Sequence, residues 1–116
     1  MDLSLETRTV AGGAVVFDMS GKLCSGEPLL LLRNKVKQSL DQGVSKFVLN
    51  LGGVSHIDSS GLGELITTHT TLKNRNGVVN LLNPSKRIKE LLQLTKLLTV
   101  FASFEDEAKA VEFLQG

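Results

Sequence analysis

The sequence is poor in cysteine and in aromatic residues. Its 116 residues include one cysteine and five phenylalanines, with no tryptophan or tyrosine. The lone Cys24 excludes a disulfide within the chain. The core must therefore be mainly aliphatic, and a hydrophobic content of 41% is enough for one core but not for two in a chain of this length. We expect a single domain that spans residues 1–116.

The sequence also lacks an excess of charge of either sign. Thirteen basic and twelve acidic residues give a net charge of +1, which does not indicate nucleic acid or an anionic membrane as the partner. The densest apolar run, 29–32, is far shorter than the roughly 20 residues that span a bilayer. The first six residues contain no basic segment followed by an apolar one. We therefore predict a cytoplasmic protein without membrane insertion, whose partner is a protein or a small ligand.

Hydrophobic periodicity predicts two strands and then a helix in the first part of the chain. Residues 3–8 alternate between apolar and polar, residues 12–13 are glycines that can form a turn, and residues 14–19 are apolar with a period of two. These features indicate an antiparallel hairpin. From Pro28 the apolar residues recur at spacings of three or four, which predicts a helix that ends near Gly43.

The remainder of the chain alternates between strand and helix. Strands are predicted at 46–51, 78–82 and 99–101, and a helix is predicted at 60–75. Two further helices are predicted, one that begins after the capping residue Asn83 and one that begins after the capping residue Ser103. This order predicts an α/β fold whose later strands are parallel and are joined by right-handed crossovers. We expect a mixed, mostly parallel sheet of four to five strands with about four helices.

The stretch Asp58-Ser59-Ser60-Gly61-Leu62-Gly63 lies where a predicted strand ends and a predicted helix begins. Ligands gather outside the carboxyl ends of strands in open α/β sheets. A helix N-terminus also concentrates unsatisfied N–H groups and partial positive charge. Two hydroxyls beside a carboxylate at such a position suit a phosphate group. The alternative is that Ser59 or Ser60 only caps the helix and that the glycines only satisfy a tight turn, and we favour this alternative for Ser60.

The sequence resembles the STAS-domain anti-sigma factor antagonists. The resemblance rests on Leu49-Asn50-Leu51, Val54 and Ile57-Asp58-Ser59-Ser60-Gly61-Leu62-Gly63, and it extends through Asn83-Pro84-Ser85 and 91–95 to the acidic start of the last helix. It covers essentially the whole chain and implies a single STAS-like domain. In that family the first serine after the aspartate is phosphorylated by a partner that is both an anti-sigma factor and a serine kinase. By position this serine is Ser59, and Ser60 is the second choice.

The resemblance implies a switch in which this chain is the substrate and not the enzyme. The unmodified form would bind the anti-sigma kinase and free a sigma factor. A phosphate on Ser59 would bring a hydrated dianion into that contact and end binding, and a phosphoserine phosphatase would restore the unmodified form. ATP and magnesium would belong to the partner, so no cofactor is expected here. The expected partner surface comprises Asp58, Ser59, Ser60, the helix surface near Gly61 and Glu64, and the loop with Cys24 and Ser25.

Two positions depart from the family pattern. Cys24 stands where antagonists commonly carry an acidic residue, and Lys96 stands where relatives often have glycine. The first departure bears on the identity of the partner, and the second predicts a slightly different turn. The pattern indicates neither the sigma factor nor the oligomeric state.

Other functions fit the sequence less well. A structural STAS subunit of a signalling scaffold or transporter complex, without direct sigma control, is the main alternative. His56, Asp58 and Ser59 have the residue types of a hydrolase triad, but neither serine lies in a Gly-x-Ser-x-Gly elbow. Gly61-Leu62-Gly63 lacks the third glycine of a dinucleotide-binding fingerprint. Two histidines and one cysteine at distant positions do not have zinc-site spacing. We therefore expect neither an enzyme nor a metal protein.

Overall fold

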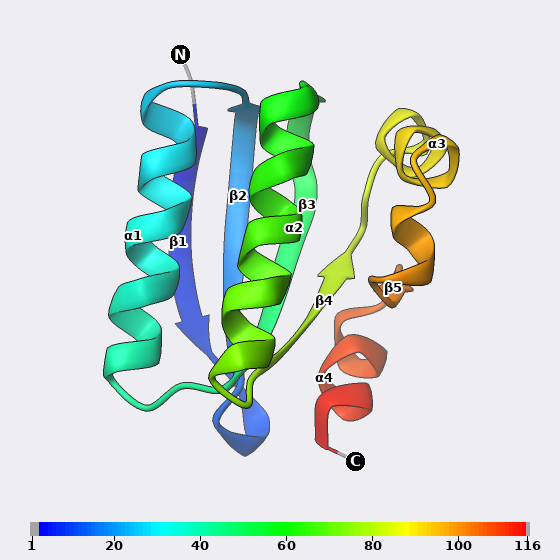
Figure 1. Cartoon of the computed structure of the whole chain (residues 1–116). Helices are drawn as coiled ribbons and strands as arrows, with labels where there is room; N and C mark the ends of the chain where they lie inside the picture. The colour runs from blue at the N-terminus through cyan, green and yellow to red at the C-terminus, as the bar shows by residue number, and fades with distance from the viewer. Residues whose placement is uncertain (1–2, 116) are drawn as a thin grey trace.

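The strands of the sheet lie in space in the same order as in the chain. In this computed structural model, which describes residues 3–115 and only the backbone of Leu98, five strands form one sheet in the order β1-β2-β3-β4-β5. β1 and β2 pair antiparallel, and every later pair is parallel. The predicted hairpin and the mixed, mostly parallel sheet are therefore confirmed (Figure 1). The strands are β1 Leu3–Thr9, β2 Val15–Leu23, β3 Lys46–Ile57, β4 Val78–Leu82 and β5 Ser103–Phe104.

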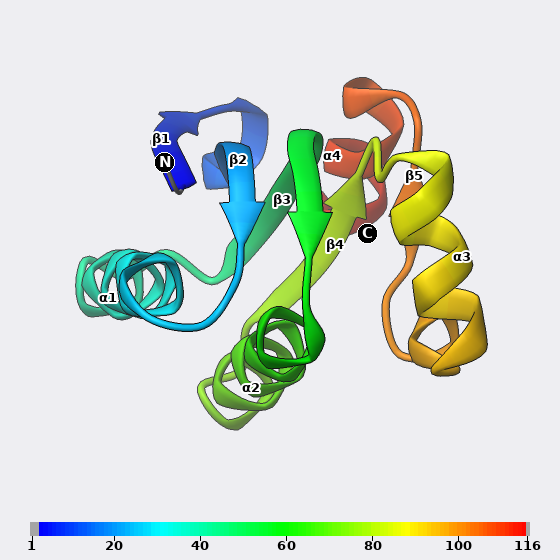
Figure 2. The ribbon, with the colours of Figure 1, turned by 90° about the horizontal axis from the view of Figure 1, so that it is seen from above.

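Helices cover both faces of this sheet unequally. α1 and α2 lie side by side on one face, α4 lies on the other, and α3 lies beyond β4 (Figure 2). Alternation along β2 produces the two cores, because Phe17 packs in the large cluster and its neighbour Val16 packs in a smaller cluster with Val111 of α4. In residues 3–115 the α-helices are α1 Glu27–Asp41, α2 Ser59–Asn74, α3 Lys86–Leu94 and α4 Glu107–Gln115, and the short 3-10 helices are η1 Ala11–Gly13 and η2 Leu97–Thr99.

β2 and β3 are both longer than the sequence predicts. The predicted ends lay at residues 19 and 51, but pairing continues until Leu23 lies beside Ile57. Polar residues and glycines in this extension conceal the strand period, and the register shifts twice along it. Gly53 is required there, since a Cβ at this position would lie 2.7 Å from the Cβ of Ser20. The extension brings the ends of β2 and β3 to the same edge of the sheet.

Three predictions in the C-terminal half are wrong. The predicted strand at 99–101 does not form: η2 ends at Thr99, and the last strand is Ser103–Phe104. Ser103 therefore does not cap the last helix, and Asp106 Oδ1 accepts a hydrogen bond from the Ala108 amide at 2.9 Å instead. α3 begins after Ser85, whose hydroxyl accepts from the Ile88 amide at 3.2 Å. Asn83 is not the cap, because its own backbone turns into the left-handed region with a φ of 54°.

Lys96 adopts a φ of 62°, the left-handed conformation that favours glycine. The lysine therefore takes the backbone conformation that a glycine would adopt at this turn. Lys96→Gly is expected to raise the free energy of unfolding by about 1 kcal/mol, because the Cβ penalty is removed. Urea denaturation measures the change. Lys73→Gly inside α2 is the control and is expected to lower the free energy of unfolding, and a loss of stability in Lys96→Gly as well would contradict the prediction.

Candidate functional site

Two loops meet where β2 and β3 end. Leu23 and Ile57 are paired neighbours, and the chain leaves them through Cys24–Gly26 into α1 and through Asp58 into α2. The Asp58 amide donates to the Leu23 carbonyl at 3.4 Å, so the two loops are in contact. The N-termini of α1 and α2 consequently lie together at one end of the sheet (Figure 1).

Asp58 joins these two loops through its side chain. Oδ1 accepts a hydrogen bond from the Gly61 amide at 2.8 Å and caps α2, and Oδ2 accepts from the Ser25 amide at 3.3 Å. The hydrogen bond from Gly61 is the main cause that holds the pKa of Asp58 below its usual range, and the amides of Ser25 and Ser60 add to it. Asp58 therefore caps α2 and holds the loop that contains Ser25.

Ser59 and Ser60 are the first two residues of α2, and both are exposed. Because Asp58 is the N-cap, the interpretation that either serine caps this helix is wrong. Within residues 3–115, neither hydroxyl forms a hydrogen bond to the protein. A phosphate on either serine would lie at the positive end of a 16-residue helix, where it stabilises rather than unfolds the helix.

Gly61 is buried at the contact between α2 and the end of β2. A Cβ at this position would collide with the carbonyl oxygen of Leu23 and would lie 2.7 Å from Cγ1 of Ile57. Only glycine therefore allows α2 to begin this close to the sheet. The expectation that Gly61 belongs to an exposed helix surface is wrong.

Glu64 is also not exposed, contrary to our expectation. Its side chain is only 4% exposed and forms an ion pair with Arg33 of α1, with Oε1 2.7 Å from Nη2 and Oε2 3.4 Å from Nε. A carboxylate this deeply buried needs such a partner. The pair joins α1 to α2, and it raises the pKa of Arg33. Glu64 is therefore a link between helices, and its partner lies 31 residues away in sequence, too far for local patterns to reveal.

The loop with Cys24 and Ser25 lies beside Asp58, as expected. Ser25 is exposed, and Cys24 is half-buried and free. The structure thus brings five of the predicted residues to one end of the molecule. They are Cys24, Ser25, Asp58, Ser59 and Ser60, and we call this surface the switch surface.

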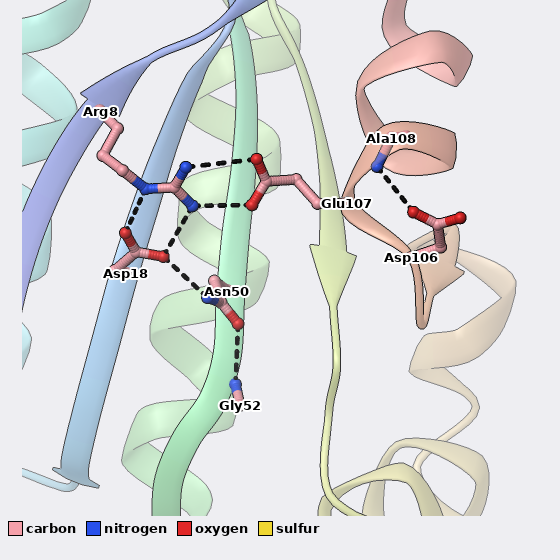
Figure 3. A network of polar contacts seen from close by, with 7 residues as sticks. All are labelled: Arg8, Asp18, Asn50, Gly52, Asp106, Glu107 and Ala108. Carbon is pink, nitrogen blue, oxygen red and sulfur yellow. Dashed lines mark hydrogen bonds and ion pairs between the residues drawn. The ribbon is translucent and has the colours of Figure 1, made fainter.

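A second polar cluster was not anticipated from the sequence. Arg8 of β1 binds Asp18 of β2 and forms two hydrogen bonds to Glu107 of α4, at 2.7 and 3.2 Å (Figure 3). Asp18 also accepts from Asn50 Nδ2 at 2.7 Å, and Asn50 Oδ1 accepts from the Gly52 amide at 3.0 Å. The cluster ties three strands to α4. Asn50 belongs to the Leu49-Asn50-Leu51 motif, which was the only indication of it in the sequence.

Asp18→Asn is expected to change how stability depends on pH. The hydrogen bond from Arg8 is the main cause that lowers the pKa of Asp18 below its ordinary value of 3.8. The ionised carboxylate therefore stabilises the fold above that ordinary value, and this stabilisation is lost as the pH falls through the folded-state pKa. Asp18→Asn should be less stable than the wild type at pH 7, and the difference should disappear as the pH falls below the folded-state pKa of Asp18.

Urea denaturation across this pH range measures the difference. Asp41→Asn is a suitable control, because Asp41 is an exposed residue whose contact with Arg75 is 3.5 Å long. A constant difference between wild type and Asp18→Asn from neutral to acid pH would show that the Arg8–Asp18 contact does not contribute in this way.

Neither a membrane-spanning helix nor a metal cluster is present in the part of the chain that the structure describes. No helix within residues 3–115 is long and apolar enough to cross a bilayer. The same residues contain no group of three His, Cys, Asp or Glu side chains that could hold a metal ion.

Comparisons with known proteins agree with this geometry. The STAS domain family model matches residues 6–110. The TM1081 homolog of Thermotoga neapolitana, predicted by its name to be an anti-sigma factor antagonist, is 29% identical over 77 residues, which cover 66% of this chain and 68% of the relative.

Solved structures with the same fold include the anti-sigma factor antagonist SpoIIAA. Its unphosphorylated form is 25% identical with a TM-score of 0.73, and the match covers 97% of this chain and 99% of SpoIIAA. The phosphorylated form of SpoIIAA from Bacillus gives the same identity and TM-score and covers 94% and 97% of the two chains. A sulfate transporter family protein from Wolinella succinogenes is 18% identical with a TM-score of 0.74, and the match covers 93% of this chain and 89% of that protein. This similarity shows a shared fold alone.

Proposed function

We propose, because this chain belongs to the STAS domain family, that it is an anti-sigma factor antagonist controlled by phosphorylation of Ser59. The unmodified protein binds an anti-sigma factor with serine kinase activity and thereby frees a sigma factor in the cytoplasm. The kinase then phosphorylates Ser59 and releases the protein, and a phosphoserine phosphatase resets it. The similarity to SpoIIAA, solved in an unphosphorylated and a phosphorylated form, supports this cycle.

The observation that carries the proposal is that the Ser59 side chain is exposed, while the neighbouring residue Asp58 caps α2. If Ser59 were the N-cap, modification would remove a hydrogen bond that α2 needs. Asp58 makes that bond instead, so the Ser59 hydroxyl can be modified without cost to the helix. Binding can therefore change while the fold persists, which is the property that a reversible switch requires.

The charge of Asp58 explains how the phosphate ends binding. Its carboxylate is held ionised by the Gly61 amide and lies one residue from the modified serine. A phosphate adds roughly 1.5 to 2 negative charges at neutral pH. Two adjacent anions cannot be buried in a protein interface without opposing charge and full hydrogen bonding. The phosphorylated switch surface is therefore excluded from a contact that the uncharged hydroxyl permits.

The switch surface acts as one unit because Asp58 holds both of its loops. The Ser25 amide and the Gly61 amide donate to opposite oxygens of this one carboxylate. A partner that contacts Ser59 therefore also meets Ser25 and Cys24. The buried residues Gly61 and Glu64 support this surface from below and do not touch the partner.

A binding experiment with three proteins tests the proposal. Wild type, Ser59→Ala and Ser60→Ala are each mixed with the anti-sigma kinase of the same genome, first without ATP and then with ATP and magnesium. All three should bind without ATP. After ATP is added, wild type and the Ser60→Ala control should be released, whereas Ser59→Ala should remain bound. Release of Ser59→Ala, or retention of Ser60→Ala, would refute the assignment of Ser59. If no kinase of that genome binds the unmodified protein, the structural-subunit alternative replaces the proposal.

A further inference from the structure

A groove lies between α1 and α2, whose residues line it. The two helices lie next to each other on the same face of the sheet in both views (Figures 1 and 2). The groove encloses a cavity of about 280 Å³, close to the lower limit for small-molecule sites in proteins. None of the residues of the switch surface lines it, so it is a separate feature of the molecule.

The floor of the groove is mainly apolar. Val36 and Leu40 of α1 and Thr68 of α2 line it, and each of these side chains is at least nine-tenths buried. An aliphatic chain laid over them would lose contact with water, and burial of its apolar surface favours binding.

The rim of the groove is cationic. Arg33 and Lys37 of α1 line the cavity together with Arg75, the residue that follows α2. All three are exposed. Two acidic residues neutralise part of this positive charge. Glu64 pairs with Arg33, and Asp41 Oδ1 lies 3.5 Å from Arg75 Nη2. In residues 3–115, Lys37 has no ion-pair partner. The groove therefore combines an apolar floor with a rim that attracts anions.

Arg33 is held in place in a way that leaves hydrogen-bond donors free. It binds the buried Glu64 through Nε and Nη2, while its side chain remains 56% exposed. A guanidinium carries five N–H donors, so Nη1 is still available to a second anion. Because Glu64 already fixes the guanidinium, an incoming carboxylate meets a preorganised donor and little side-chain freedom is lost on binding.

We propose that this groove binds a free aliphatic carboxylate of medium chain length. The acyl chain lies over Val36, Leu40 and Thr68, and the carboxylate lies between Arg33 and Lys37. The two halves of the groove thus recognise the two halves of one amphipathic anion. This site goes beyond the proposed phosphorylation switch and does not depend on Ser59.

Titration with sodium octanoate, followed by amide NMR shifts, tests the proposal. Saturable shifts are expected at Thr67, Thr68 and Thr71, with a dissociation constant on the order of 1 mM. Hexanoate should bind more weakly, by about twofold to fourfold for each methylene removed. Octylamine, which has the same chain and the opposite charge, should not bind in the groove. The absence of saturable shifts, shifts that map elsewhere, or equal binding of octylamine would overturn the proposal.

A pair of charge reversals on α1 locates the carboxylate. Lys37→Glu is expected to weaken octanoate binding by about tenfold or more, since it replaces an attractive charge by a repulsive one. Lys35→Glu makes the same change in net charge at a residue that does not line the groove, and it should bind octanoate like the wild type. Equal affinity of both variants would contradict the proposed position of the carboxylate. Shifts of the groove amides with protein concentration alone would show that a second copy occupies the groove, and this result would also overturn the proposal.

Discussion

Gly61→Ala is expected to lower the free energy of unfolding by about 3 kcal/mol. The added methyl group would collide with the backbone carbonyl of Leu23, and it would also meet Ile57 Cγ1 at 2.7 Å. A backbone carbonyl at the end of a paired strand cannot turn aside as a flexible side chain can. α2 would have to move away from the sheet, which would loosen the Asp58 bridge to Ser25 as well. Urea denaturation followed by circular dichroism measures the loss.

Gly63→Ala is the matched control for this prediction. Gly63 lies in the same helix, but a Cβ there meets nothing within 4 Å. Alanine is the better helix former by up to about 1 kcal/mol, so this variant should be as stable as the wild type or more stable. If Gly61→Ala were no less stable than Gly63→Ala, the close approach of α2 to β2 would not be present in solution.

Phosphorylation of Ser59 is expected to weaken binding of the anti-sigma kinase by more than about a hundredfold. The phosphate would be placed beside the ionised Asp58, and the contact would have to bury both anions. The melting temperature of the modified protein should stay the same or rise, because the helix N-terminus favours negative charge. Isothermal titration calorimetry gives the affinity, and circular dichroism gives the stability of the same sample.

The two readouts together distinguish a surface switch from local unfolding. Asp58→Ala is the informative comparison, because it removes the cap and the bridge to Ser25 without adding charge. It should lose both stability and affinity, whereas phosphorylation of Ser59 should reduce affinity alone. A phosphorylated protein that melts earlier than the unmodified one would contradict the view that α2 tolerates the phosphate.

Local sequence patterns predicted most of the fold. The hairpin and the alternation of strand and helix follow from a change in hydrophobic period, which depends only on neighbouring residues. The pattern failed where polar residues and glycine occupy a paired strand, as at Gly53 in the extension of β3. It failed again in the C-terminal half, where Ser85 caps α3 instead of Asn83, and Asp106 caps α4 instead of Ser103. Several residues near each helix start have side chains that can cap it, so the sequence alone does not identify the cap.

The candidate site was predicted in part. The sequence places Asp58, Ser59 and Ser60 at a strand-to-helix junction, but it does not show which of the three caps the helix. That choice depends on the geometry of the turn, and the structure assigns it to Asp58. The burial of Glu64 could not be foreseen either, since its partner Arg33 comes from another helix. Such contacts between distant segments leave no local period in the sequence.

Location of the phosphate is the most direct test of the central claim. The wild-type protein would be phosphorylated to completion by its anti-sigma kinase, digested, and sequenced by tandem mass spectrometry, so that Ser59 and Ser60 are distinguished. We predict one phosphate per chain, on Ser59. A phosphate on Ser60 or at any other residue, or a chain that remains unmodified by a kinase that binds it, would contradict the account.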